Sequence, residues 1–381
     1  MYMANVLNNI KKNIKTFLIY FKMLFKKKYL AKTDFKNFTV RDNCVALFEF
    51  YSFHGEVLPG LIKYLLDLDY NVDLVLNKKE WSKGEQSYNR NNYNDSGLFS
   101  YFKENNKVEF KILEDYEMNQ LLQSDIKLKY KHIILNSFYD DMEQTYLHNI
   151  DLFKLKPICM MHNPDIINEY FKTNKIISLV NMKCDNREPV FVVNSHYFGE
   201  FQRKEKSTIT TFVTLNTKDL SRRNLYLLFE ACDKLYERKI NNFIVKIIGT
   251  GIKIPDIYHN NFQIFGFLNF EKMFEQIALS DFFLALIDQE SISYTNKASG
   301  CYQLSYGFLK PILLHNKFSA VSGFTDENSI LYNNNNELAD VMEKCINMSN
   351  DNYNHLVTAL EKSQRELYNT SLNNLKKVME I

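Results

Sequence analysis

The stretch between Asp281 and Pro311 holds acidic, basic and hydroxyl side chains close together in the sequence. In chain order they are Asp288, Glu290, Lys297, Ser299 and Gly300. A helix is predicted to begin at Ser299-Gly300, and a lysine beside such a helix start joins its unpaired N–H groups and hydroxyl in binding an anion. The two acids follow an apolar strand and could hold sugar or ribose hydroxyls. Taken separately, Ser299 could be only an N-cap and Glu290 only a solvated loop acid.

Basic residues also follow the apolar run Thr211–Leu215. Lys218 and Arg223 lie just before a helix that we expect to start near Asn224. Arginine offers a planar fork of donors and the helix start adds backbone N–H groups, so the pair suits a diphosphate. A solvated basic turn is the alternative.

Two glycines, Gly249 and Gly251, come directly after the apolar run Phe243–Ile248. Glycine lets the backbone approach a ligand closely, or simply forms a tight turn. The spacing is not that of a dinucleotide-binding G-x-G-x-x-G fingerprint. A structural turn is therefore the favoured interpretation, with substrate binding as the second.

Three short polar clusters that contain a histidine follow apolar runs in the first half. They are His54-Gly55-Glu56, His162-Asn163-Pro164 and Asn194-Ser195-His196. A single histidine is more often structural than functional, so only the repeated position at strand ends suggests that they line a ligand site. None has the spacing of a zinc motif, and we predict no metal.

From residue 44 onward, short apolar runs alternate with helical patterns, which predicts an α/β fold. The runs are Val45–Tyr51, Val72–Leu76, His132–Leu135, Ile158–Met161, Val190–Val193, Thr211–Leu215, Phe243–Ile248, Phe262–Phe265, Phe282–Leu286, Ile312–Leu314 and Ile330–Tyr332. Such runs, rich in β-branched and aromatic residues, indicate buried parallel strands. The polar segment 200–207 separates two sets of runs. We therefore expect two Rossmann-like domains, 34–205 and 206–348, facing a cleft, followed by C-terminal helices in 349–381.

Residues 1–33 form a basic amphipathic segment with eight lysines and no acid. Its apolar stretches are too short to span a bilayer, and no signal-peptide cleavage site follows them. We expect a helix that lies in the membrane interface, attracted by anionic lipid headgroups. A solvated helix docked on its own domain is the alternative.

The remaining composition bounds the partners and the compartment. A net charge of +2 gives no case for nucleic-acid binding. The six cysteines are scattered without a C-x-x-C pair, as is typical of reduced thiols in a cytoplasmic protein. Together with the basic N-terminus, this predicts a cytoplasmic protein that is peripheral on the inner face of the membrane.

The second half resembles the C-terminal domain of retaining glycosyltransferases of the GT-B fold, close to family 4 (glycosyl transferases group 1). The resemblance covers residues 208–345 well and 44–200 more loosely. Where the family has an arginine followed five residues later by a lysine, this chain has Lys218 and Arg223, so the two basic types are exchanged. Asp281 and Glu290 have the nine-residue spacing of the family's strand and first glutamate. The other matching segments are Gly249-Thr250-Gly251, Ile264-Phe265-Gly266 and Gly307 to Ile312.

The resemblance implies roles for particular residues. Glu290 would contact the donor sugar and His162 would reach the transferred sugar, so both would act at the reacting centre. The second glutamate of the family falls at Ala298 here, and the ribose contact would pass to Gln303. Lys218, Arg223 and the Ser299-Gly300 helix start would stabilise the diphosphate, so that neither a metal nor another cofactor is required.

The expected function is transfer of a hexosyl group, with retention, from a nucleoside diphosphate sugar, UDP-linked, to a hydroxyl group. The acceptor would be a glycan or a lipid-linked glycan bound near His54-Gly55-Glu56, as in the biosynthesis of a cell-surface polysaccharide such as lipopolysaccharide or capsule. Two alternatives stay open. One is a sugar-nucleotide epimerase of the same architecture, and the other is a non-catalytic scaffold that binds a glycan or a partner enzyme.

Overall fold

The computed structural model describes residues 38–51, 54–82, 96–136, 157–162, 175–183, 190–216, 223–249, 254–258 and 260–380. The chain divides into two compact units, Met1–Thr39 and Val40–Ile381, and both of its sheets lie in the second unit. The basic segment 1–33, Lys218 and Gly251 lie outside the described residues. What the sequence predicts for them therefore stays a prediction.

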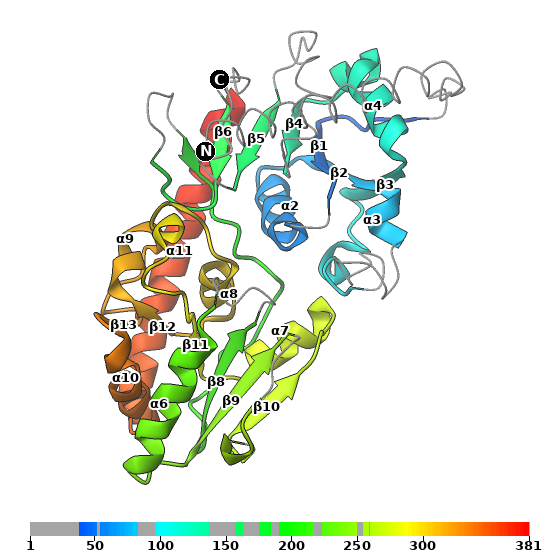
Figure 1. Cartoon of the computed structure of the whole chain (residues 1–381). Coiled ribbons are helices and arrows are strands. Elements are labelled where there is room, and N and C mark those ends of the chain that lie inside the picture. The colour runs from blue at the N-terminus through cyan, green and yellow to red at the C-terminus, as the bar shows by residue number, and fades with distance from the viewer. Residues whose placement is uncertain are drawn as a thin grey trace, which may run out of the picture. The chain divides into compact units, whose positions relative to one another are not determined.

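The first sheet is parallel and has the strand order β3-β2-β1-β4-β5-β6-β7 (Figure 1). Its strands are β1 (Cys44–Glu49), β2 (Asn71–Asn77), β3 (Val108–Leu113), β4 (His132–Leu135), β5 (Ile158–Met161), β6 (Ile176–Ser178) and β7 (Phe191–Val192). The strand order changes direction between β1 and β4, which pair in the middle of the sheet. Ligands of open parallel sheets bind beyond the strand ends at such a switch point.

The second sheet is also parallel and has the strand order β10-β9-β8-β11-β12-β13. Its strands are β8 (Thr210–Leu215), β9 (Phe243–Ile248), β10 (Phe262–Phe265), β11 (Phe282–Leu284), β12 (Ile312–His315) and β13 (Ile330–Tyr332). The switch point here lies between β8 and β11. The predicted α/β class with two parallel sheets is confirmed.

Each apolar run that the sequence marks as a strand forms one, with small shifts at its ends. The burial of these runs explains why the prediction works, since strands such as Cys44–Glu49 are buried along their whole length. Two strands were not predicted. β3 is mostly half-buried and alternates charged with apolar residues, and β6 is only 3 residues long.

Helices lie between the strands and after them (Figure 1). They are α2 (Leu58–Asp67), α3 (Lys78–Ser82), α4 (Asp115–Gln123), α6 (Leu225–Glu237), α7 (Phe270–Ala278), α8 (Gly300–Phe308), α9 (Ser319–Ser322), α10 (Leu338–Ile346) and α11 (Asn350–Glu380). Both α6 and α7 begin at an asparagine, Asn224 and Asn269, whose side chain accepts a hydrogen bond from a backbone N–H of the first turn.

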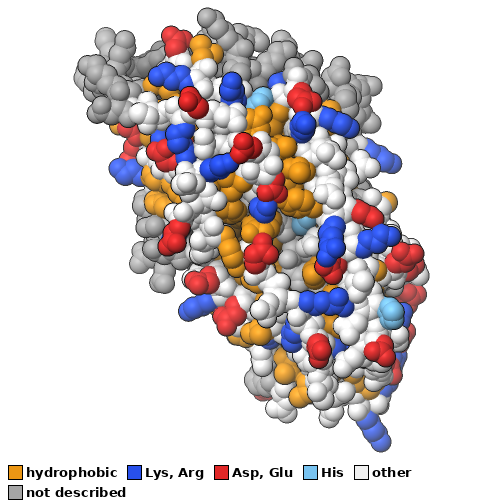
Figure 2. Space-filling model, turned by 180° about the vertical axis from the view of Figure 1, so that it is seen from behind, with side chains coloured by type: hydrophobic (Ala, Val, Ile, Leu, Met, Phe, Trp, Pro, Cys, Tyr) orange, Lys and Arg blue, Asp and Glu red, His pale blue; other side chains and the backbone are white. Residues whose placement is uncertain are grey.

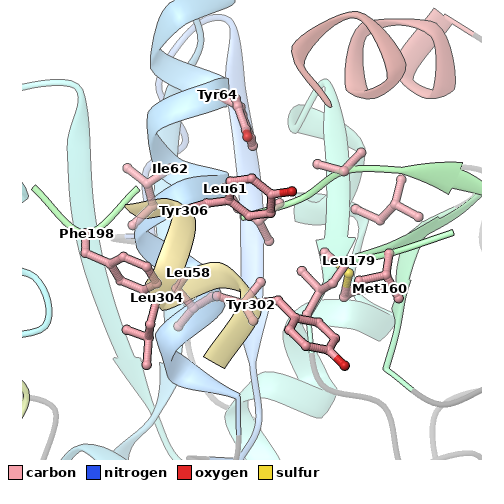
Figure 3. Packing of buried hydrophobic residues seen from close by; sticks show 14 of the residues in the cluster. Leu58, Leu61, Ile62, Tyr64, Met160, Leu179, Phe198, Tyr302, Leu304 and Tyr306 are labelled. Atoms are coloured by element: carbon pink, nitrogen blue, oxygen red, sulfur yellow. The ribbon is translucent and has the colours of Figure 1, made fainter. Parts of the chain in front are cut away.

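One buried hydrophobic cluster includes residues of both sheets. Leu58 and Leu61 of α2 belong to it together with Leu304 and Tyr306 of α8 (Figure 3). The connecting segment 193–209 passes close to α8, because a Cβ added to Gly307 would lie 2.4 Å from the backbone oxygen of His196. The absence of a side chain at Gly307 therefore allows α8 to pack directly on this segment.

The C-terminal helix α11 returns to the first sheet. The side-chain amide of Asn374 donates to the carbonyl of Val192 over 2.9 Å, and the Ser371 hydroxyl accepts from the backbone N–H of Asn194 over 2.9 Å. The hydroxyl of Tyr368 donates a hydrogen bond to the carboxylate of Asp67 in α2. The segment predicted as C-terminal helices is thus one long helix that ties the end of the chain to its first half.

The surface seen in Figure 2 carries Lys and Arg side chains interspersed with Asp and Glu. No large area of one sign is visible among the described residues of this face, as the small net charge of +2 would suggest. Within the described ranges, no helix combines the length and the apolar character that crossing a membrane requires.

Candidate functional site

The predicted cation Arg223 and the predicted helix start at Ser299 come together in the structure. Arg223 lies between β8 and α6, and Ser299 precedes α8, yet the Arg223 Nη2 donates to the Ser299 Oγ over 3.0 Å. The same nitrogen lies 3.7 Å from the Cys301 Sγ. Arg223 is 8% exposed and Ser299 4% exposed. A buried guanidinium therefore lies at the start of α8, where the dipole of the helix is positive.

The side chain of Ser299 does not cap its own helix. Ser299 occupies the N-cap position of α8 but accepts no hydrogen bond from the first turn. Its hydroxyl instead contacts Arg223 and, at 3.0 Å, the Cys301 Sγ. A Cβ added to Gly300 would meet no atom within 4 Å. The start of α8 is thus uncapped by Ser299 and open at Gly300, which is the arrangement that an anion needs.

The ring of a buried tyrosine lies close to two cations of this region. Tyr294, which is 4% exposed, has the Arg223 guanidinium carbon 5.9 Å and the Lys297 Nζ 5.9 Å from its ring centroid. Cations at this distance are attracted by the electrons of an aromatic ring. Tyr294 lies in the short helical turn Ile292–Asn296, and the sequence indicated no role for it.

The loop after β11 brings Asp288 toward the same region. The backbone N–H of Glu290 donates to the Asp288 Oδ1 over 2.9 Å, and the Asp288 Oδ2 accepts from the side chain of Asn224 over 3.3 Å. Asn224 directly follows Arg223 and donates its backbone N–H to the carbonyl of Leu286. Asp288 thus joins the β11 loop to the start of α6. Glu290 is exposed, and none of the described contacts joins it to Arg223 or Ser299.

Gln303 and Gly249, both predicted to bind substrate, differ in what surrounds them. Gln303 is in the first turn of α8 and 3% exposed, and its Nε2 has no hydrogen-bond partner within the described part of the chain. Gly249 has a φ of 134°, and a Cβ there would lie 2.4 Å from the backbone oxygen of Asn216. The tight turn alone is therefore enough to explain a glycine at position 249, and the contact of Gly249 with substrate stays a prediction.

In the first half, His54 and His162 lie against each other. Their rings stack with centroids 3.8 Å apart and planes 9° from parallel. The carboxylate of Glu56 is 3.8 Å from the Nδ1 of His54, and Gly55 is buried in the short helical turn Gly55–Val57 that leads into α2. Two of the three polar clusters that the sequence indicated therefore meet beyond the ends of β1 and β5.

Burial sets the charge of His162. It lowers the pKa of His162 well below the ordinary value, and the neighbouring His54 and Lys297 lower it further, whereas the hydrogen bond to the carbonyl of Asn136 raises it. His162 is therefore neutral at physiological pH. The ammonium of Lys297 also lies near enough to act on this ring, so the predicted residues of the two halves approach each other here.

The third histidine cluster is not part of this site, and the suggestion that it lines the same site is wrong. His196 is 3% exposed and its Nδ1 contacts the Asn194 Oδ1 at 3.0 Å. Its ring lies within packing distance of Tyr306 in α8 and Tyr368 in α11. Since helices cover it on these sides, His196 belongs to the core of the connecting segment.

Two polar residues of this region were not among the predicted site residues. Glu49 ends β1 and Asn136 follows β4, and both are 0% exposed. The only signal in the sequence was an acid at the end of an otherwise apolar run.

Within the described ranges, no three His, Cys, Asp or Glu side chains gather as the ligands of a metal would.

Solved structures share this architecture over most of the chain. TarM from S. aureus, in complex with fondaparinux, α-GlcNAc-glycerol and UDP, matches 89% of this chain and 100% of its own, with 10% identity and a TM-score of 0.62. An α-glucosyltransferase in complex with UDP and a 13-mer DNA containing an HMU base matches 86% and 100%, with 12% identity and a TM-score of 0.54.

The α,α-trehalose 6-phosphate synthase of Burkholderia multivorans matches 89% of this chain and 98% of its own, with 8% identity and a TM-score of 0.53. The chain has the GT-B fold. At these identities the likeness concerns the fold alone. The sequence matches no protein-family model and no curated protein.

Proposed function

We propose that this GT-B chain is a glycosyltransferase that moves a sugar from a nucleoside diphosphate sugar to a hydroxyl of a glycan or a lipid-linked acceptor. The observation that carries the proposal is the arrangement at α8. Ser299 bonds to Arg223 and leaves its own helix uncapped, so that a buried guanidinium and an open helix start lie together. A diphosphate is the group that such a site suits.

The chemistry follows from the charge of the leaving group. The bond between the anomeric carbon and the diphosphate oxygen breaks, a bond to the acceptor oxygen forms, and the proton of the acceptor hydroxyl passes to the departing diphosphate. Negative charge grows on the diphosphate, where Arg223, Lys297 and the first N–H groups of α8 stabilise it. The buried amide nitrogen of Gln303, which lacks a described partner, suits a hydroxyl of the ribose. Glu290 would hold the sugar.

The acceptor would bind beyond β1, β4 and β5, near His54, Glu56 and His162. TarM, of the same fold, is seen with UDP and with α-GlcNAc-glycerol, which supports a UDP-linked donor. A retaining hexosyl transfer, a role in cell-surface polysaccharide synthesis, and contact of residues 1–33 with the inner face of the membrane complete the proposal. No metal is assigned to it.

Nucleotide binding tests the site. We expect Arg223→Ala to weaken UDP binding by about tenfold to a hundredfold, since a charge-assisted hydrogen bond contributes about 1.5–3 kcal/mol. Arg238→Ala is the matched control, because Arg238 is ion-paired to Asp340 and Glu343 on α10. Isothermal titration with UDP measures both. Equal affinity of the parent and Arg223→Ala for UDP would contradict the site.

Glu290→Ala should leave the affinity for UDP unchanged and reduce the preference for a UDP-sugar over UDP. The exposed loop acid Glu327 provides a control in Glu327→Ala. A panel of nucleotide sugars scored by thermal shift, and then by product formation with and without acceptor glycans, completes the test. Turnover without any acceptor would favour the epimerase alternative, and failure to bind any nucleotide would favour the scaffold.

A further inference from the structure

A buried carboxylate at the end of β1 connects three segments of the first half. Glu49 is 0% exposed, and its Oε1 accepts from the backbone N–H of Tyr51 over 3.1 Å. Its Oε2 accepts from the side-chain amide of Asn136, which follows β4. Glu49 therefore holds both the chain that leads toward His54 and the end of the neighbouring strand.

Asn136 is held in place from several directions. Its backbone N–H donates to the carbonyl of Phe48 over 3.0 Å, and its Nδ2 donates to the carbonyl of His54 over 3.2 Å as well as to Glu49. Both protons of the side-chain amide are thereby used. The backbone oxygen of Asn136 is consequently fixed relative to β1.

That oxygen determines the protonation of His162. The Asn136 carbonyl lies 2.7 Å from the His162 Nε2. A carbonyl oxygen can only accept a hydrogen bond, so Nε2 carries the proton of the neutral ring, and Nδ1 keeps its lone pair. The stacked ring of His54 lies against the face of the same imidazole. His162 thus offers one acceptor nitrogen in a fixed ring orientation.

A second acceptor lies in the same cluster. The Asn136 Oδ1 is buried and has no hydrogen-bond partner among the residues that the structure describes. Burying a carboxylate and leaving an amide oxygen without a partner both cost free energy. Buried polar atoms without a partner are rare in folded proteins, so this one calls for an explanation, and a bound ligand is one. A cluster that offers acceptors suits a ligand that donates hydrogen bonds from hydroxyl groups, as a sugar does.

We infer that Glu49 and Asn136 are positioning residues that hold His162 in the Nε2-protonated form, so that its Nδ1 accepts a hydrogen bond from a sugar hydroxyl during transfer. The inference rests on the proposed function for the identity of the ligand. The tautomer itself is a property of the free protein and can be measured without any substrate.

The test is the ¹⁵N spectrum of the histidine rings in the full chain at neutral pH, with His162 assigned by its loss in His162→Phe. In the parent, His162 should show a protonated Nε2 and an unprotonated Nδ1. In Glu49→Gln and Asn136→Ala it should show exchange between the two tautomers. A parent protein with the proton on Nδ1, or an unchanged tautomer in both variants, would overturn the inference.

Asp73→Asn is the matched control. Asp73 is also a fully buried carboxylate of the first sheet, but it bonds to Arg41 and Tyr130, and it pairs with Ala46, well before the end of β1. We expect it to lower stability without changing the tautomer of His162. Circular dichroism shows which variants fold. If Glu49→Gln does not fold, the parent spectrum and Asn136→Ala still decide the matter.

A kinetic measurement separates this inference from the proposed function. With an accepted donor and acceptor, Glu49→Gln should lower kcat by about tenfold to a hundredfold, as misplacement of a group at the reacting centre does, while the affinity for UDP stays that of the parent. Absence of transfer by the parent would refute the proposed function and leave the tautomer result standing. A lower UDP affinity with unchanged kcat would refute the positioning role.

Discussion

At the scale of single residues, Ser299 shows what a sequence pattern leaves undecided. A serine before a helix is the usual N-cap, and the same serine beside a lysine and a glycine is also an anion site. The N-cap and the anion site are predicted by the same sequence pattern, and only the hydrogen-bond partner of the Ser299 hydroxyl distinguishes them. In the structure the hydroxyl contacts Arg223, a residue 76 positions away. Such a distant partner has no local signature in the sequence.

Tyr294 provides a prediction at this scale, because its ring lies near both Arg223 and Lys297. Tyr294→Leu should weaken UDP binding by about tenfold, since cation–π contacts contribute about 0.5–2 kcal/mol each. Tyr294→Phe keeps the ring and should bind UDP within about twofold of the parent. Titration calorimetry measures both. An equal loss in the two variants would assign the effect to the hydroxyl instead of the ring.

Glu49 and Asn136 were missed for a related reason. Glu49 stands in the run Val45–Tyr51, whose apolar character predicts a strand and draws attention away from its one acid. Whether that acid is buried depends on which strand pairs beside β1. The pairing of β1 with β4, more than 80 residues later, places the side-chain amide of Asn136 beside Glu49. Its hydrogen bond offsets part of the free-energy cost of burying the Glu49 carboxylate.

At the scale of elements, the strands of both sheets were predictable because they are buried on both faces and therefore read as continuous apolar runs. The start of α6 was also predictable from Asn224, whose side chain caps it, and the start of α8 from the Ser299-Gly300 pair that precedes its first turn. Half-buried β3 and the short β6 give weak local signals. Their place in the sheet comes from pairing with β2 and β5.

Two glycines of α8 give a matched pair of substitutions. Gly307→Ala would place a Cβ 2.4 Å from the backbone of His196, and overpacking of this kind costs about 1–3 kcal/mol. Gly300→Ala meets no atom within 4 Å and should change the free energy of unfolding by less than about 0.5 kcal/mol. Its methyl group would nevertheless occupy the open helix start and weaken UDP binding.

Urea unfolding and UDP titration of the two variants check this prediction. Loss of stability in Gly307→Ala with intact stability and weaker UDP binding in Gly300→Ala is the expected result. Parent-like UDP affinity in Gly300→Ala would contradict the use of the α8 start as an anion site. The proposed geometry of the connecting segment would be wrong if Gly307→Ala unfolded like the parent.

At the scale of the whole molecule, stability should depend on pH through buried histidines. Burial lowers the pKa of His196 to about 4, below its value of about 6.5 in the unfolded chain. The unfolded chain therefore binds the proton first, and stability is lost as the pH falls from about 6.5 toward 4. Between pH 7 and pH 5, His196 alone should account for a loss of about 2 kcal/mol.

Urea unfolding at pH 7 and pH 5 measures this loss in the parent and in His196→Gln. The variant lacks the titrating ring, so its stability should differ less between the two pH values. A pH dependence that is the same in both proteins would exclude His196 as a source. His162, whose pKa burial also lowers, contributes in the same direction and should account for part of the remainder.

The whole fold could be predicted from the order of its elements, whereas the identity of its ligands could not. Both switch points, between β1 and β4 and between β8 and β11, follow from the strand order, and the two groups of polar residues described above lie beyond them. The fold therefore indicates where the donor and the acceptor of the proposed function would bind. It does not select the sugar, because side chains from loops make that choice.

The return of α11 to the first sheet also bears on how the protein is made. β7 is the last strand in the order of the first sheet, and α11 binds it: the Val192 carbonyl accepts from Asn374, and the N–H of Asn194 donates to Ser371. A ribosome therefore releases the first half long before the helix that covers it has been synthesised. During that interval an unprotected sheet edge is exposed to other chains. The packing of this sheet edge must therefore wait for the synthesis of α11.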